Sequence, residues 1–346
     1  SGKELRLRQQ YFLSSASLQD ILAQWIENHG QDFTGFTDQH VFQLNDTHPS
    51  IAVAELMRLL IDEHGLSWNK AWSITSTTMA YTNHTLLPEA LEKWSVRLFE
   101  RLLPRLLEII YEINARFLLQ VAQRWPGDVD KTRQMSIIEE GDEPQIRMAY
   151  LAIIGSYSVN GVAALHTKLL TNGLFNDFYQ LSPQKFNNKT NGVTPRRWLH
   201  HCNPALSDLI TSTIGEQWVN DFSQIQKLAN YADDEKLQAQ WQQVKFDNKV
   251  KLAELVQERC GVEFDPNMMF DVQVKRIHEY KRQLLNILHV IYRYERICNG
   301  DTATMVPRCI LLGGKAAPGY DMAKQIIKLI SNVADTINND PLAKPY

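Results

Sequence analysis

Hydrophobic positions in the first half of the chain recur at helical spacing. A short apolar run at residues 40–44 interrupts this pattern and is typical of a buried strand. Residues 1–191 are therefore predicted to be mainly helical. The predicted helices lie at about residues 4–27, 48–64, 67–81, 86–124, 146–171 and 174–180.

After about residue 190 the pattern changes to alternating strands and helices. Residues 268–274 and 308–312 are short apolar runs that predict strands, whereas residues 277–297 and 320–337 have helical spacing. A strand-helix-strand-helix order is typical of a parallel sheet that is covered by helices. We therefore expect an α/β protein whose second region covers residues 192–346.

Four cations and a histidine follow the first of these strands, in the sequence VKRIHEYKRQ from Val274 to Gln283. Lys275 and Arg276 are expected in a loop, and the predicted helix places His278, Lys281 and Arg282 on one face. Backbone amides at a helix start attract anions, and arginine with lysine suits a phosphate dianion. The segment predicts a phosphate site; the alternative is a solvated basic helix start.

Other loops are rich in glycine or in neutral polar groups. Residues 313–319, GGKAAPG, follow the second strand, but they match neither GxGxxG nor the P-loop pattern, so a tight turn is an equal interpretation. Residues 81–85 concentrate neutral donors and acceptors that suit sugar hydroxyls, although a histidine in such a loop is more often a capping or core group. Residues 45–50 mark a helix entry, and the polar, turn-rich residues 187–198 lie where the two patterns meet and would face any cleft between the lobes. The sequence contains neither a GxSxG elbow nor a spaced pair of carboxylates. It therefore does not indicate a hydrolase.

Composition narrows the class of protein. The 346 residues suit two domains, and the net charge of -3 argues against nucleic acid as a partner. Apolar runs fall short of the ~20 residues that cross a membrane, and no signal segment opens the chain. Four scattered cysteines without ligand spacing indicate reduced thiols, no metal site and a cytoplasmic protein. These features leave the reaction open.

Six motifs, in order, resemble those of the α-glucan phosphorylases, the family of glycogen, starch and maltodextrin phosphorylases. The resemblance implies a two-lobe, glycosyltransferase-B-like α/β fold with Rossmann-type lobes and an active site between them. Residues 1–191 would end the N-terminal lobe, and residues 192–346 would begin the C-terminal lobe. The motifs are NDTHP from Asn45, YTNHT from Tyr81, WPGD from Trp125, TNGVTPRRW from Thr190, VKRIHEYKR from Val274 and GKAAPGY from Gly314.

The resemblance also implies a reaction and a cofactor. A glucosyl unit moves from the non-reducing end of an α-1,4-glucan to orthophosphate, which gives α-D-glucose 1-phosphate with retention. Pyridoxal 5'-phosphate is the implied cofactor, and its phosphate serves as a proton relay. By resemblance, Arg276 binds the substrate phosphate, Lys281 lies near both phosphates, Lys275 binds the cofactor phosphate, and Trp198 walls the cofactor pocket.

On the sugar side, His84 and Asn191 resemble the groups that hold the 6-hydroxyl of the reacting glucose, and Asp46 borders this site. Residues 200–206, HHCNPAL, resemble a bacterial maltodextrin phosphorylase, with glycogen still open as a substrate. The family forms homodimers, so the parent protein is expected to be a homodimer.

The sequence opens at Ser1 in a helical pattern and closes at Tyr346 in a loop, so we expect an internal fragment, incomplete at both ends. The family's Schiff-base lysine is expected downstream of Tyr346, and the fragment alone is expected to be inactive. Two alternatives remain: a glucan-binding fragment without chemistry, and a nucleotide-sugar glycosyltransferase of similar architecture.

Overall fold

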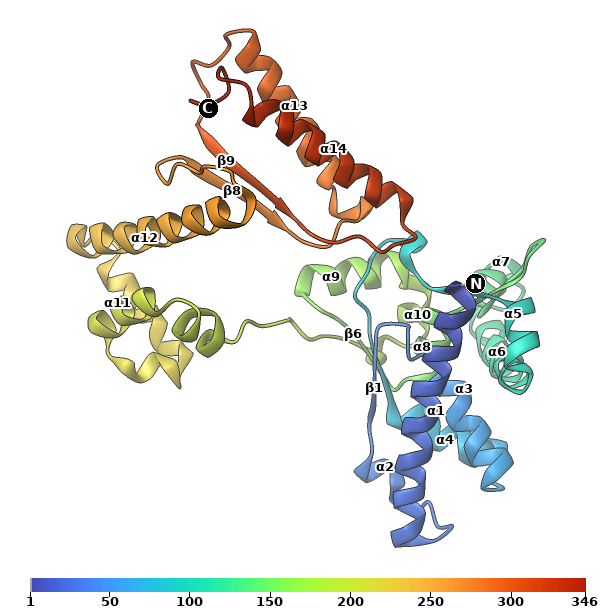
Figure 1. Ribbon diagram of the computed structural model, residues 1–346. Coiled ribbons are helices and arrows are strands. Elements are labelled where there is room, and N and C mark those ends of the chain that lie inside the picture. The colour runs from blue at the N-terminus through green and yellow to red at the C-terminus, as the bar shows by residue number, and fades with distance from the viewer. Residues whose placement is uncertain (1) are drawn as a thin grey trace. The chain divides into compact units, whose positions relative to one another are not determined.

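The computed structural model describes residues 2–346, and the chain divides into two compact units. The first unit is Ser1–Gly192 and the second is Val193–Tyr346. A large cluster of buried hydrophobic side chains fills the first unit, whereas a smaller cluster around Ile277, Ala323 and Ile326 lies in the second. Figure 1 shows helices and strands in both units, which makes the protein an α/β protein, as predicted.

A sheet of four parallel strands forms the centre of the first unit, in the order β1-β2-β6-β7. Tyr81 on β2 lies between Leu44 on β1 and Val159 on β6, and all three side chains are buried. This burial fits a parallel sheet that helices cover. The strands are β1 (Phe42–Asn45), β2 (Met79–Thr82), β6 (Ser158–Gly161) and β7 (Phe186–Asn188).

Helices α3 and α8 belong to the core of this unit. Buried residues make up nearly all of α8, and the carboxylate of Glu55 on α3 is buried as well. Glu55 accepts hydrogen bonds from Ser15 Oγ at 2.6 Å and Arg58 Nε at 2.8 Å, which compensates its burial. The helices are α1 (Gly2–His29), α2 (Phe36–Gln39), α3 (Ala52–Arg58), η1 (Leu59–Glu63), α4 (Trp68–Thr78), η2 (Pro88–Ala90), α5 (Val96–Leu102), α6 (Pro104–Arg124), α7 (Val129–Met135), α8 (Met148–Gly155), α9 (Ala164–Leu169), η3 (Leu170–Leu174), α10 (Asn176–Leu181) and η4 (Pro183–Lys185).

A small antiparallel sheet completes the first unit, in the order β3-β5-β4. Trp94 and Ile146 face each other across β3 and β5, and both are buried. The strands are β3 (Lys93–Ser95), β4 (Ile138–Glu139) and β5 (Gln145–Arg147).

The second unit contains a parallel strand pair, β8 and β9, in which Val274 lies opposite Gly313. Helices α13 and α14 follow these strands and pack against each other. The predicted strand-helix-strand-helix order is confirmed. The elements are η5 (Arg196–His201), α11 (Pro204–Ile214), η6 (Glu216–Val219), η7 (Phe222–Tyr231), α12 (Glu235–Cys260), β8 (Met269–Val274), η8 (Glu279–Lys281), α13 (Gln283–Cys298), β9 (Arg308–Gly313) and α14 (Asp321–Asn338).

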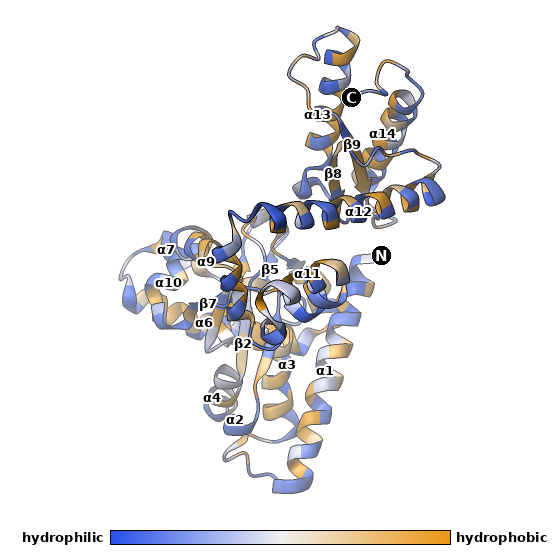
Figure 2. Ribbon diagram, turned by 90° about the vertical axis from the view of Figure 1, so that its left-hand side faces the viewer, coloured by the Kyte–Doolittle hydropathy of each residue, from blue (hydrophilic) through white to orange (hydrophobic). Residues whose placement is uncertain are grey.

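Helix α12 carries hydrophilic and hydrophobic residues along its whole length (Figure 2). Val256 is its buried residue, while Trp241 and Leu255 are about half exposed. Within residues 2–346, no helix combines the length and the apolarity that crossing a membrane requires.

Three helix predictions for the first unit are wrong because short strands lie inside the predicted ranges. Residues 67–81 form a helix only to Thr78 and then continue as β2. The range 86–124 contains β3, and Pro104 begins a new helix because it cannot continue the preceding one. The range 146–171 contains β6 between α8 and α9. Each of these strands has only three or four residues, which is too short for an alternating pattern to distinguish it from the helices beside it.

Lys185, at the end of η4, has a largely buried ammonium group. Its Nζ donates to the backbone oxygens of Ile153 and Ile154 at the end of α8, both at 3.3 Å. Burial lowers the pKa of Lys185 from 10.5 to about 8. Between these values the folded chain loses the proton first, so this residue makes the fold more stable as the pH rises.

We expect the Lys185→Met variant to lose this pH dependence. Relative to the variant, the free energy of unfolding of the wild-type chain should rise by about 3 kcal/mol between pH 8 and pH 10.5. Urea denaturation of both chains across this range measures the difference. A constant difference between the two chains would show that the ammonium group is not desolvated.

Candidate active site

The carboxyl edge of the parallel sheet in the first unit brings three predicted site residues to one place. Asp46 directly follows β1, His84 follows β2, and Asn191 follows β7. Ligands of parallel α/β sheets bind beyond the carboxyl ends of the strands. The register of the sheet thus gathers residues that are far apart in the sequence.

The first two loops of this edge are joined by hydrogen bonds. His84 Nε2 lies 2.6 Å from Asn45 Oδ1, and the Asp46 amide donates to Thr82 O at 3.0 Å. Asp46 has a left-handed backbone, with φ of 66°, and its Oδ2 lies 3.7 Å from His48 Nε2. The imidazole of His84 is exposed, and its Nε2 is the nitrogen that bonds to Asn45.

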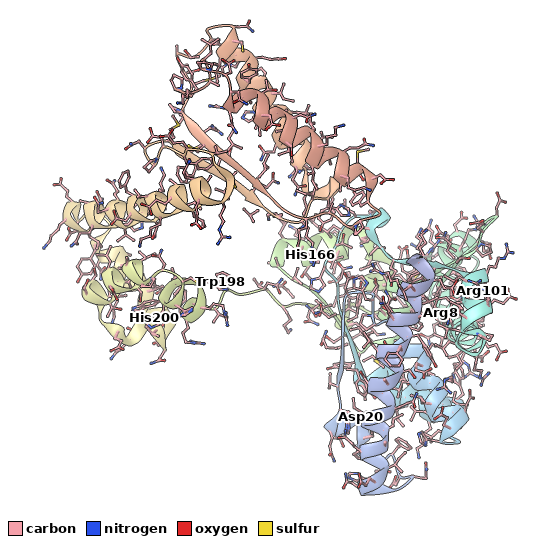
Figure 3. All side chains as sticks on the ribbon, viewed as in Figure 1. Arg8, Asp20, Arg101, His166, Trp198 and His200 are labelled. Atoms are coloured by element: carbon pink, nitrogen blue, oxygen red, sulfur yellow. The ribbon has the colours of Figure 1, made fainter. Side chains whose placement is uncertain are left out.

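The loop after β6 supplies a residue that was not predicted, His166 on α9 (Figure 3). Its Nδ1 accepts from the Val162 amide at 3.0 Å, and Val162 O accepts from the Asn191 amide at 3.0 Å. The backbone of Val162 therefore links His166 to the segment that carries Asn191.

The side chain of His166 is half-buried. Burial, and then the neighbouring His84, lowers the pKa of His166, which favours the neutral ring. Because Nδ1 accepts a hydrogen bond, the proton belongs on Nε2, and this nitrogen is buried without a partner among residues 2–346. A Cβ on Gly161 would lie 2.7 Å from Nδ1 and 2.3 Å from Thr167 Oγ1, so the turn requires glycine.

In the second unit, the predicted phosphate cations gather after β8. Lys275 and Arg276 follow the last residue of the strand, and Lys281 lies at the end of the short helix η8. Within the second unit, residues 193–346, these three side chains and that of Arg282 form no ion pair. The cluster thus offers charge to an anion.

The predicted helix start at residue 277 is wrong. Helix α13 begins at Gln283, and Arg282 before it has a left-handed backbone with φ of 61°. His278, Lys281 and Arg282 consequently do not share a face of α13. Residues 275–282, which we call the basic loop, form a turn outside the regular helix.

Gln283, the first residue of α13, holds the basic loop and was not predicted as a site residue. Its side chain is fully buried. Nε2 donates to Arg276 O at 3.0 Å, and Oε1 accepts from the His278 amide at 3.3 Å. The sequence contained no signal for this role, because the position fell inside the predicted helix.

The loop after β9 lies directly against the basic loop. The Lys275 amide donates to Gly313 O, and the Ile277 amide donates to Lys315 O, both at 3.0 Å. A Cβ on Gly314 would lie 2.0 Å from Lys275 O, so no larger residue fits there. Tyr320 OH donates to Glu279 Oε2 at 2.5 Å, which ties α14 to the turn.

Trp198, which was predicted to wall the cofactor pocket, is not bonded to the basic loop. It is on η5 and its side chain is 61% exposed (Figure 3). Among residues 2–346, no hydrogen bond or ring contact joins it to the cations. Its predicted place beside a cofactor stays a prediction.

The family model for the carbohydrate phosphorylases matches residues 1–346. The chain belongs to the carbohydrate phosphorylase family. Its resemblance to the α-glucan phosphorylases, stated above from the motifs alone, is thereby confirmed. Both polar edges described above lie inside the matched range.

Curated relatives in this family are glycogen phosphorylases. The muscle form of Bos taurus is 53% identical over 348 residues, and the muscle form of Oryctolagus cuniculus is 54% identical over 348 residues. Glycogen phosphorylase 2 of Dictyostelium discoideum is 54% identical over 341 residues. The matches cover 98 to 99% of this chain, and the chain spans 41% of the two mammalian proteins and 34% of the Dictyostelium protein.

Proposed function

We propose that the full-length protein carrying this chain is an α-glucan phosphorylase. It transfers a glucosyl unit from the non-reducing end of an α-1,4-glucan to orthophosphate, with retention, and releases α-D-glucose 1-phosphate. The supporting observation is the basic loop, whose four cations have no carboxylate partner within their own unit, residues 193–346. Unpaired cations at a strand end suit phosphate, and the enzyme class follows from the family.

The same donor set fits pyridoxal 5'-phosphate, which we propose as the cofactor. Exposed Lys275 and half-buried Lys281 offer compact charges, and Arg276 offers a planar fork of donors, which together suit two phosphate dianions. When bound, the cofactor supplies its phosphate as a proton relay. The covalent lysine is expected outside this chain, and Trp198 is proposed to border the cofactor.

Three of the four cations have separate proposed tasks. Arg276 binds the substrate phosphate, Lys281 offsets repulsion between the two phosphates, and Lys275 binds the phosphate of the cofactor. Two dianions side by side repel strongly where water is scarce, so nearby fixed cations lower the energy of bringing them together.

The edge of the first unit is proposed to hold the sugar. His84 and Asn191 bind the 6-hydroxyl of the reacting glucose, and Asp46 borders the same site. The bond from His84 to Asn45 orients the imidazole, and the bond from the Asn191 amide to Val162 fixes the Asn191 backbone.

Substrate preference, cellular location and oligomeric state are further proposals. The curated relatives are glycogen phosphorylases, which favours glycogen, whereas residues 200–206 favour maltodextrin; α-1,4-glucan is the class common to both. We also propose a cytoplasmic homodimer whose two lobes include residues 1–191 and 192–346.

Glucose 1-phosphate release tests this function. Full-length protein is incubated with maltoheptaose and orthophosphate, with and without pyridoxal phosphate, and cofactor-dependent release is expected. Release from the 346-residue chain alone would contradict the expectation that it is inactive. Glucan binding without release by the full-length protein would favour a binding module, and binding of nucleotide sugars would favour the glycosyltransferase alternative.

A further inference from the structure

A buried amide is bonded at both ends to the backbone of the basic loop. The side chain of Gln283 has no exposed surface, and its two polar atoms bind Arg276 O and the His278 amide. The residue between these partners, Ile277, is buried in the small core of the unit. Gln283 thus fixes the peptide groups on both sides of an anchored residue.

A second pair of amides binds the other end of the loop. Gln273 on β8 donates from Nε2 to Lys281 O at 3.1 Å. Its Oε1 accepts from Asn286 Nδ2 on α13 at 2.9 Å. The chain of bonds therefore runs from the loop backbone through Gln273 on the strand to Asn286 on the helix.

The three amides, Gln273, Gln283 and Asn286, form what we call the amide clamp. Their targets include the backbone oxygens of Arg276 and Lys281, the residues with the proposed phosphate tasks. No ion pair within residues 193–346 holds the cationic side chains. Their placement consequently depends on the backbone from which they extend.

The choice of amides is informative because burying one is unfavourable. A polar side chain taken out of water destabilises the fold unless its hydrogen bonds are replaced. An apolar residue of similar volume could fill the space of Gln283 without this requirement. Both polar atoms of Gln283 are used on the loop, so loop geometry accounts for the amide.

We propose that the amide clamp, with Gln283 as its central member, is a positioning element that sets Arg276 and Lys281 for phosphate. This inference rests on the proposed phosphorylase function. The clamp itself does not touch phosphate; it acts through the loop backbone. Its loss should therefore affect the use of phosphate more than the use of glucan.

The test compares Gln283→Met with Val290→Ala in the full-length holoenzyme. Methionine keeps the volume and loses both bonds, whereas Val290 is a buried residue two turns further along α13. Gln283→Met should raise the KM for orthophosphate by about tenfold or more and leave the KM for maltoheptaose within about twofold. Gln283→Glu keeps the acceptor for the His278 amide but places a second oxygen against Arg276 O, so it should not restore the KM for orthophosphate.

Hydrogen exchange of the basic loop supplies a readout that is independent of catalysis. Peptides that contain residues 275–282 should exchange faster in Gln283→Met than in Val290→Ala. Equal rises in both KM values, or unchanged exchange, would overturn the positioning role. A wild-type protein that neither releases glucose 1-phosphate nor binds orthophosphate by calorimetry would refute the proposed function, and exchange would still decide whether the clamp orders the loop.

Discussion

Replacing Arg276 by alanine is expected to raise the KM of the full-length enzyme for orthophosphate by about a hundredfold, with little change in the KM for glucan. Arg276 extends from the basic loop and has no carboxylate partner in the second unit, residues 193–346, so its charge suits an anionic ligand. Charge-assisted, two-pronged contacts to phosphate are among the stronger hydrogen bonds in proteins. Steady-state kinetics with each substrate varied in turn measures the two effects separately.

Arg259→Ala provides the matched control for this experiment. Arg259 is exposed in the last turn of α12, and its ion pair with Glu258 has an N–O distance of 3.8 Å. Loss of this charge should change neither KM. Equal losses of phosphate and glucan affinity in Arg276→Ala would contradict the assignment of Arg276 to phosphate.

Replacing Gly314 by alanine is expected to disrupt both the stability of the second unit and the use of phosphate. The new Cβ would lie 2.0 Å from Lys275 O and 3.0 Å from Ile277 Cδ1, and the first contact is with backbone. The two loops must separate, which should lower the free energy of unfolding by about 2–4 kcal/mol. Urea denaturation measures this change, and kinetics of the full-length enzyme should show a higher KM for orthophosphate.

Gly319→Ala in the same loop separates this clash from a general effect of alanine. A Cβ on Gly319 meets no atom within 4 Å. This variant should stay within about 1 kcal/mol of the wild type, because alanine also restricts the unfolded chain. If Gly314→Ala were as stable as Gly319→Ala, the close approach of the two loops would be refuted.

The second unit was the more predictable part of the fold. Runs such as residues 268–274 and 308–312 lie between turn-forming segments and alternate with long helical patterns, so their identity as strands was clear. In the first unit, β2 begins at Met79, directly after the last residue of α4, without an intervening polar turn. Apolar residues on a buried strand and a buried helix look alike, and only the assembled sheet distinguishes them.

The site was predictable in its residues but less so in its geometry. The cations of the basic loop could be named from composition, yet their helical face depended on a helix that begins later, at Gln283. The left-handed backbone of Arg282 breaks the expected register, and no local pattern signals it. His166 and Gln283 bond to backbone only four and seven residues away, but these bonds depend on turns that the hydrophobic pattern does not reveal.

The cations of the basic loop also repel one another. Four cations lie within residues 275–282, with Glu279 as the only acid, and that carboxylate accepts a bond from Tyr320. Like charges this close destabilise the loop at low ionic strength, and salt or a bound dianion relieves the repulsion. An anion at this loop is therefore a counter-ion for the fold as well as a ligand, and the melting temperature of the protein should depend on phosphate concentration.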